Sequence, residues 1–264
     1  MKPVRFDYRA PASLDEALPL LGLETAVLAG GQSLVPLLNL RLARPELVVD
    51  VNGIAELDYI RADQGALRIG ALTRQVALER SELVGRRWPL LHKAVRLVGH
   101  PQIRTRGTVG GSVAHADPAA ELPAALIALG ARFHLRSAAG ARALGASEFF
   151  LGPLYTAREP DELLVEVEVP EQPEGAGSGF AEHARTHGDF ATAGAAAVIA
   201  AGHAGIALLG AGPVPVRAEA AERALADGAA PPEAGALAAQ DVEDEHRRAL
   251  CTELARRAIQ EAMP

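Results

Sequence analysis

The sequence predicts a mixed α/β and α+β fold, in which two small subdomains are followed by a smaller α+β carboxy-terminal domain. Three observations support this prediction. The first 55 residues alternate short apolar strands with a glycine turn and a helical segment, as α/β units do. Residues 171–178, rich in Glu, Gly and Pro, have the composition of a linker. Residues 246–263 carry apolar side chains at helical spacing and predict a closing helix.

We therefore divide the chain into a first subdomain, a second subdomain and a carboxy-terminal domain, at residues 1–55, 56–172 and 178–264. In the first subdomain the pattern predicts a strand, a helix, a strand, a helix and a strand, at residues 4–6, 13–21, 26–29, 34–42 and 47–51. Ser13 and Glu16 have the spacing of a capping box, which marks the start of the first helix.

The second subdomain begins with a strand at residues 67–71 and a helix capped by Thr73, and a longer helix follows at 89–98. Residues 100–116 form a polar stretch punctuated by glycine. Asp117 before Pro118 predicts the start of another helix, because Asp is a favoured N-cap and Pro a favoured first helical residue. Two or three strands, including residues 163–169, complete this part. The carboxy-terminal domain contains three expected strands and two helical stretches, with the strands at 179–185, 190–200 and 206–209.

Charge and cysteine content exclude several classes of function. The formal net charge is −7 and no basic run is present, so nucleic-acid binding is not expected. The single cysteine, Cys251, excludes an internal disulfide and an all-thiolate iron–sulfur cluster built by this chain alone. The first 13 residues lack the apolar core of a secretory signal, and the apolar runs are too short for a membrane span. These features predict a cytoplasmic protein.

Two glycine turns are the strongest candidates for a binding site. The first is Ala29-Gly30-Gly31-Gln32-Ser33, and the second is Thr108-Val109-Gly110-Gly111-Ser112. Paired glycines let backbone N–H groups approach an anion closely, because no Cβ intervenes. Neither turn has the spacing of a dinucleotide-binding G-x-G-x-x-G motif or of a phosphate-binding P-loop, and a lone Gly-Gly pair is more often structural.

The residues around both turns resemble a known family. LAGGQSLVPLLNLRLARPELVVDV (residues 28–51) and GHPQIRTRGTVGGSVAHADPAAELPA (99–124) are similar to the two FAD-binding signatures in the medium subunits of molybdenum hydroxylases, which include carbon monoxide dehydrogenase and xanthine dehydrogenase. FAEHARTHGDFATAGAA (180–196) and HRRALCTELARRAIQEA (246–262) resemble parts of the family's carboxy-terminal domain. The resemblance implies the two-subdomain, PCMH-type FAD-binding fold.

The resemblance also implies which residues bind FAD. Both turns would wrap the pyrophosphate and ribityl chain through backbone N–H groups. Glu121 would contact the ribityl chain, Leu164 would lie on a strand against the flavin, and Ile103 would press on the isoalloxazine. The full implied set is Ala29, Gly30, Gly31, Gln32, Ser33, Leu34, Ile103, Thr108, Val109, Gly110, Gly111, Ser112, Asp117, Glu121, Leu164 and Glu182.

Two departures from the family pattern concern Ser112, where many members have Asn, and residues 210–245, which look shorter than usual. Plain structural roles compete at other positions. Asp117 is first of all a cap, His100 and His115 are more readily loop histidines than metal ligands, and at most one of Arg104 and Arg106 would reach the cofactor. No catalytic side chain and no metal ligand are predicted.

The resemblance implies an electron-transfer role. A molybdenum cofactor in a large partner subunit would oxidise the substrate, and [2Fe–2S] clusters in a small partner subunit would pass electrons to FAD in this chain. A dimer of such heterotrimers is expected. Two alternatives remain open: a self-contained FAD-dependent oxidoreductase with its own substrate, and an assembly protein that has lost its cofactor.

Overall fold

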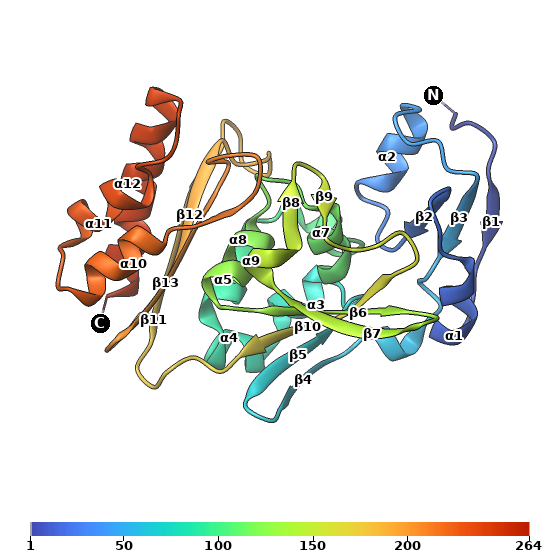
Figure 1. Ribbon diagram of the computed structural model, residues 1–264, viewed down its shortest axis with the longest axis horizontal. Coiled ribbons are helices and arrows are strands. Elements are labelled where there is room, and N and C mark those ends of the chain that lie inside the picture. Colours follow the sequence, from blue (N-terminus) through green and yellow to red (C-terminus); the bar gives the residue numbers. More distant parts are fainter. Residues whose placement is uncertain (1, 264) are drawn as a thin grey trace.

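The computed structural model describes residues 2–263. Its three larger sheets follow one another along the chain (Figure 1). The first is a three-stranded parallel sheet of order β1-β3-β2, built from β1 (Asp7–Arg9), β2 (Thr25–Leu28) and β3 (Leu47–Asp50). Helix α1 (Leu14–Ala17), the 3₁₀ turn η1 (Leu18–Leu20) and helix α2 (Leu34–Asn39) connect these strands.

Two predictions for this subdomain need correction. The first strand lies at residues 7–9 and not at 4–6, since it is the segment from Asp7 that pairs with β3. The Ser13 hydroxyl does accept from the Glu16 N–H at 3.3 Å, but the Glu16 carboxylate accepts from Ala12 N–H. The helix that this cap begins is one turn long, because the chain tightens into the 3₁₀ turn around Pro19.

The second sheet is antiparallel and five-stranded, of order β4-β5-β10-β6-β7. Its strands are β4 (Ile60–Asp63), β5 (Ala66–Gly70), β6 (Arg132–Ser137), β7 (Gly140–Gly145) and β10 (Leu163–Pro170). The helices in this part of the chain are η2 (Ala55–Leu57), α3 (Gln75–Arg80), α4 (Glu82–Arg87), α5 (Pro89–Leu97), α6 (Pro101–Arg104), α7 (Val109–His115), α8 (Glu121–Ala128) and α9 (Ala146–Phe149). A small hairpin pairs β8 (Phe150–Gly152) with β9 (Tyr155–Thr156).

Two sequence predictions fail in this segment. Thr73 does not cap α3, because its hydroxyl donates to Tyr59 O at 2.8 Å. Asp117 accepts from Ala119 N–H at 2.9 Å and so closes a turn, and the next helix begins only at Glu121. The polar, glycine-punctuated stretch at 100–116, to which no element was assigned from the sequence, contains α6 and α7.

The third sheet is antiparallel, of order β11-β12-β13-β14, and consists of β11 (Gly177–His183), β12 (Ala193–Ala200), β13 (His203–Leu209) and β14 (Val216–Arg217). Three helices follow it, and not the two expected: α10 (Glu219–Ala226), α11 (Pro231–Ala238) and α12 (Glu245–Ala262). Helix α12 packs closely on β11, since a Cβ at Gly179 would lie 2.0 Å from Ala258 O. Cys251 is buried on this helix, as expected for a core residue.

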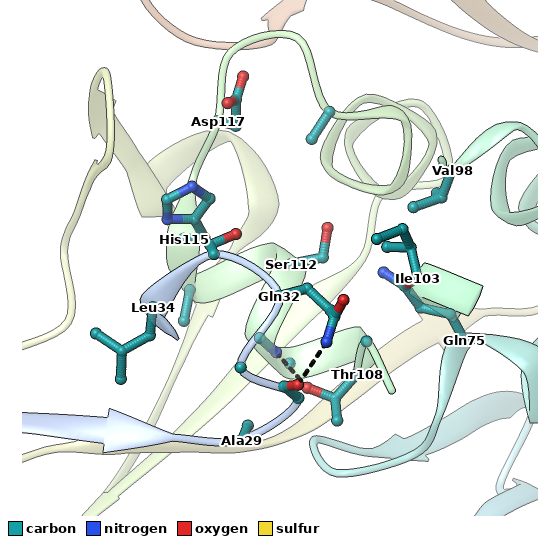
Figure 2. Close-up of a pocket in the computed structure, with 18 of the residues that line it drawn as sticks. Ala29, Gln32, Leu34, Gln75, Val98, Ile103, Thr108, Ser112, His115 and Asp117 are labelled. Carbon is teal, nitrogen blue, oxygen red and sulfur yellow. Dashed lines mark hydrogen bonds between the residues drawn. The ribbon is translucent and has the colours of Figure 1, made fainter. Parts of the chain in front are cut away.

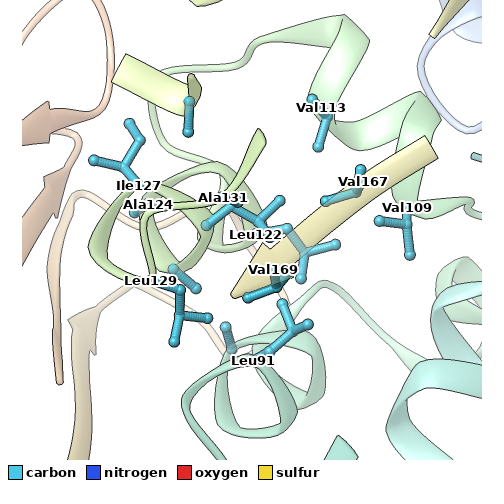
Figure 3. Close-up of a cluster of buried hydrophobic side chains, with 14 of the residues drawn as sticks. Leu91, Val109, Val113, Leu122, Ala124, Ile127, Leu129, Ala131, Val167 and Val169 are labelled. Atoms are coloured by element: carbon cyan, nitrogen blue, oxygen red, sulfur yellow. The ribbon is translucent and has the colours of Figure 1, made fainter. Parts of the chain in front are cut away.

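The main core joins the second and third sheets (Figure 3). Helix α8 lies at its centre and every one of its residues is buried, including Glu121 at its first position. Leu122 and Ile127 of α8 belong to the same cluster as Ala196 and Leu209 of the third sheet. This arrangement holds one carboxyl group at the edge of an apolar core. None of the helices in residues 2–263 combines the length and apolar character needed to cross a bilayer.

Candidate functional site

A cavity with a volume of about 460 Å³ opens between the first subdomain and helix α7 (Figure 2). Both glycine turns line it, although they are separated by more than 70 residues in the chain. Residues 188–190, from the loop between β11 and β12, form another part of the wall. The first glycine turn, the second glycine turn and the loop at residues 188–190 therefore contribute to one cavity.

The first glycine turn presents unused backbone donors. Gly31 adopts a left-handed conformation with φ of 73°, which favours glycine. The Gln32 side-chain amide donates to Gly30 O at 3.0 Å and closes the turn (Figure 2). Within residues 2–263, the backbone N–H groups from Gly30 to Leu34 donate to no protein acceptor. Such a run of consecutive free N–H groups is typical of an anion-binding nest.

The second glycine turn begins helix α7, and four of its five backbone N–H groups, those of residues 109–112, donate within the protein. Val109 N–H donates to Thr73 O and Gly110 N–H to Ala71 O, both at 2.9 Å. Gly111 N–H donates to the Thr108 hydroxyl at 3.0 Å (Figure 2). Ser112 N–H donates to Thr108 O at 3.1 Å. The Thr108 N–H, which has no acceptor among residues 2–263, and the hydroxyls of Thr108 and Ser112 are left to bind a ligand.

A polar clamp fixes the two turns against each other. Asn52 donates from its side chain to Ala29 O at 2.8 Å and accepts from the Arg74 guanidinium at 2.7 Å. Arg74 also donates to Arg106 O, just before the second turn. The backbones meet here, because a Cβ at Gly30 would lie 2.4 Å from Arg106 O. Glycine at position 30 is thus required for the close approach.

Carboxyl groups with raised pKa values lie on the far side of the cavity. Glu121 lines the cavity and is 4% exposed. Burial, with smaller contributions from the charges of Glu182 and Asp117, raises its pKa to about 8. Burial also raises the pKa of Glu182 to about 7, and its Oε2 has no partner among the described residues. Glu121 is therefore predominantly neutral at pH 7.

The cavity brings together fourteen of the sixteen residues singled out from the sequence: Ala29, Gly30, Gly31, Gln32, Ser33, Leu34, Ile103, Thr108, Gly110, Gly111, Ser112, Asp117, Glu121 and Leu164. The other two lie outside its lining. Val109, the first residue of α7, is fully buried, and Glu182 lies on β11, where its charge contributes to the raised pKa of Glu121.

Several lining residues were not singled out from the sequence. Gln75, Arg158 and Phe190 lie on the wall, and so does His115, which had been interpreted as a loop histidine. No local motif marks Gln75 or Arg158, since they reach the cavity only through sheet pairing and the β8–β9 hairpin. His115 follows Gly111 by four residues, a helical spacing that could have indicated its place near the second turn.

Neither Arg104 nor Arg106 is among the residues that line the cavity. Arg104 is 7% exposed and binds Glu79 with Nε–Oε2 at 2.8 Å and Nη2–Oε1 at 3.2 Å. It also donates to the carbonyls of Val98 and Gly99. Arg104 is therefore a structural residue that supports the segment before the second turn, and it does not line the cavity.

One cluster outside the cavity has ligand types that could hold a metal. His134, Glu166 and Glu168 place one ligand atom each within 4.8 Å of the others on the second sheet. Arg68 binds Glu166 at 2.6 Å and Glu168 at 3.1 Å. Because Arg68 pairs with both carboxylates and Arg61 lies 3.9 Å from Glu166, this group is an ion-pair network of the sheet.

Comparisons with known proteins identify the family of this chain. Residues 4–172 match the family model described as the FAD binding domain in molybdopterin dehydrogenase. The chain is 44% identical over 236 residues to the 6-hydroxypseudooxynicotine dehydrogenase complex subunit alpha of Paenarthrobacter nicotinovorans, covering 86% of this chain and 80% of the relative. It is 42% identical over 227 residues to the carbon monoxide dehydrogenase medium chain of Hydrogenophaga pseudoflava, covering 83% of this chain and 79% of that one.

The fold agrees as well. A solved carbon monoxide dehydrogenase from Hydrogenophaga pseudoflava, in a form lacking the Mo-pyranopterin moiety, superposes with a TM-score of 0.93 at 40% identity. The match covers 99% of this chain and 98% of that one. The predicted family and mixed α/β fold class are confirmed. This chain belongs to the FAD-binding subunits of the molybdenum hydroxylase family of oxidoreductases.

Proposed function

We propose that this chain binds FAD in the cavity between its glycine turns and acts as the electron-transfer subunit of a molybdenum hydroxylase complex. The observation that carries the proposal is the run of free backbone N–H groups from Gly30 to Leu34 on the wall of this cavity. A pyrophosphate has several acceptor oxygens and two negative charges, so it matches such a nest.

The other wall residues fit the remaining parts of FAD. The hydroxyls of Thr108 and Ser112 can donate to phosphate or ribityl oxygens. Glu121, neutral at pH 7, adds no charge opposing the anionic cofactor and can exchange hydrogen bonds with ribityl hydroxyls. Ile103 and Leu164 are apolar wall residues that suit the face of the isoalloxazine.

The remaining predicted residues take supporting places in this proposal. Ala29 is held by the Asn52 clamp, and Gln32 closes the first turn over the phosphates. Asp117 closes the turn that leads into α8. Val109 anchors the second turn from beneath, and Glu182 acts on Glu121 through its charge.

When bound, FAD supplies electron transfer, accepting electrons from partner iron–sulfur clusters and releasing them to an external acceptor. The residues of this chain bind and orient the cofactor and cover part of its ring. The assembly that we propose contains a large molybdopterin-binding subunit and a small [2Fe–2S] subunit, as a dimer of heterotrimers in the cytoplasm. Named relatives include a dehydrogenase complex subunit and a medium chain, which supports a role as one subunit of several.

A visible absorption spectrum of the purified chain, alone and copurified with its partners, tests this function. We expect a flavin spectrum from the chain, with iron–sulfur and molybdenum signals only when larger and smaller chains are present. Turnover of an organic substrate by the chain alone would instead establish a self-contained flavoenzyme. A folded chain that takes up no added FAD would refute the proposal.

A further inference from the structure

The cavity wall contains a buried amide side chain whose oxygen has no hydrogen-bond partner. Gln75, the first residue of α3, is 4% exposed and lines the cavity. Its backbone N–H donates to Gly107 O at 2.9 Å, which fixes the residue beside the second glycine segment. Its Oε1 is buried without a partner among residues 2–263. Since buried amides are ordinarily satisfied, this one needs an explanation.

The surrounding backbone holds the Gln75 carboxamide in place. A Cβ at Gly107 would lie 2.5 Å from Gln75 Oε1 and 3.1 Å from Ile103 O, so only glycine leaves room for the amide there. The side chain is therefore confined to a slot between α3 and the segment that follows α6. A confined and incompletely satisfied amide is suited to a ligand, because its orientation is already fixed.

The neighbouring wall is apolar. Val98, Gly99 and Ile103 line the cavity with Gln75, and Figure 2 shows the side chains of Gln75, Val98 and Ile103 together on one side of it. Ile103 packs against Gly99, where a Cβ would lie 3.2 Å from Ile103 Cγ1. An apolar wall with one polar group is typical of sites that bind a ring and fix its orientation.

We propose that the Gln75 carboxamide forms a hydrogen bond with the flavin half of bound FAD, that is, the isoalloxazine or ribityl chain, and not with the ADP half. This inference rests on the proposed function, which places the isoalloxazine against Ile103. The flavin ring edge and the ribityl hydroxyls offer both donors and acceptors, and a carboxamide can pair with either kind.

Gln75→Met tests the inference, because methionine keeps the length of the side chain and removes both polar atoms. The matched control is Gln102→Met, an exposed residue on α6 outside the cavity lining. We would measure dissociation constants of the flavin-free chain for FAD, riboflavin and ADP, the visible spectrum of the bound flavin, and the melting temperature without flavin.

We expect Gln75→Met to weaken FAD and riboflavin binding by about tenfold, the usual effect of one hydrogen bond, and to shift the flavin spectrum. ADP binding should stay unchanged. The flavin-free melting temperature should hold or rise, because removing an unpaired buried oxygen relieves its desolvation cost. Gln102→Met should change none of these.

Unchanged FAD affinity with a lower melting temperature would show that Gln75 has an internal, structural partner, and would overturn the inference. A loss of ADP affinity would assign the amide to the wrong half of the cofactor and would overturn it as well. If the wild-type chain itself bound no FAD, the proposed function would be refuted. If the wild-type and Gln75→Met chains bound FAD equally well, only the inference about Gln75 would be refuted.

Discussion

The two glycine turns share the pattern Gly-Gly followed by a polar residue, yet their backbone N–H groups differ in hydrogen bonding. In the first, the N–H groups from Gly30 to Leu34 are free. In the second, the N–H groups of residues 109–112 all donate to protein acceptors. The first turn is built to bind an anion, whereas the second is a tightly packed helix start that positions hydroxyls.

This difference shows that a glycine pair can serve two structural purposes: it can permit a left-handed backbone conformation, or it can leave space for a close backbone contact. At Gly31 the residue supplies a left-handed φ, which turns consecutive N–H groups to one side. At Gly110 it supplies space, because a Cβ would lie 2.5 Å from Ala71 Cβ and 2.7 Å from Ala71 O. Substitutions should therefore separate loss of binding from loss of folding.

The largest effect is expected for Gly110→Ala. The added methyl group would collide with Ala71, the residue that follows β5, whose backbone cannot move aside. We therefore expect a loss of about 3 kcal/mol in the free energy of unfolding. Urea unfolding of the flavin-free chain measures it. Gly111→Ala is the control, since its Cβ would meet only the Thr108 hydroxyl at 2.6 Å, a side chain that can rotate. Equal destabilisation by both changes would refute the packing role of Gly110.

The next effect concerns the acidic side of the cavity, beyond the second turn. Glu121 has a folded pKa of about 8, above that of the unfolded chain. Its contribution to stability is therefore complete below about pH 4 and is lost as the pH rises through 8. Glu121→Gln should raise the free energy of unfolding by roughly 2 to 4 kcal/mol at pH 9 and by much less at pH 5.

Unfolding of the flavin-free chain at both pH values checks this prediction. Glu174→Gln, at an exposed position between β10 and β11, is the control and should leave the pH dependence unchanged. A Glu121→Gln chain that loses stability equally at both pH values would mean that the carboxyl group forms a hydrogen bond which glutamine does not replace.

Gly31→Ala should affect binding more than folding. An alanine at φ of 73° costs about 1 kcal/mol in stability, and relief of that strain would turn the free N–H groups away from a common anion. We expect the dissociation constant for FAD to rise about tenfold, as for the loss of one or two hydrogen bonds.

Gly130→Ala is a matched control for this backbone strain. Gly130 has φ of 68° with no atom within 4 Å of its would-be Cβ, and it does not line the cavity. It should lose similar stability and keep full FAD affinity. If both variants bound FAD equally well, the first turn would not be the anion site.

The sequence alone was sufficient for the fold class and for most of the cavity. The short strands around Val27 and Val49 and the closing helix follow from apolar periodicity, and motif resemblance found fourteen lining residues. Periodicity did not reveal α7, because Gly110 and Gly111 are poor helix formers. Gly110 is held there by its contact with Ala71, and Gly111 by its bond to the Thr108 hydroxyl. Tertiary packing overrides local propensity at that point.

The sequence also could not predict which backbone N–H groups are free to bind a ligand. Whether an N–H group is free depends on acceptors from distant strands, as for Gly110 and Ala71 O. Gln75 and Arg158 reach the cavity by the same long-range pairing, so no local pattern marks them. The raised pKa of Glu121 depends on the burial of α8 between two sheets.

The smallest effect is expected for Ser112→Ala, and it addresses the comparison most directly. The Ser112 N–H already donates to Thr108 O, so the hydroxyl is its main means of contacting a ligand. Its removal should weaken FAD binding about threefold to fivefold, near the lower range for one hydrogen bond, with no change in unfolding. Ser112→Asn, which restores a donor, should recover affinity. If Ser112→Ala had no effect while Gly31→Ala abolished binding, the second turn would serve only to pack and position, and the first would hold the anion alone.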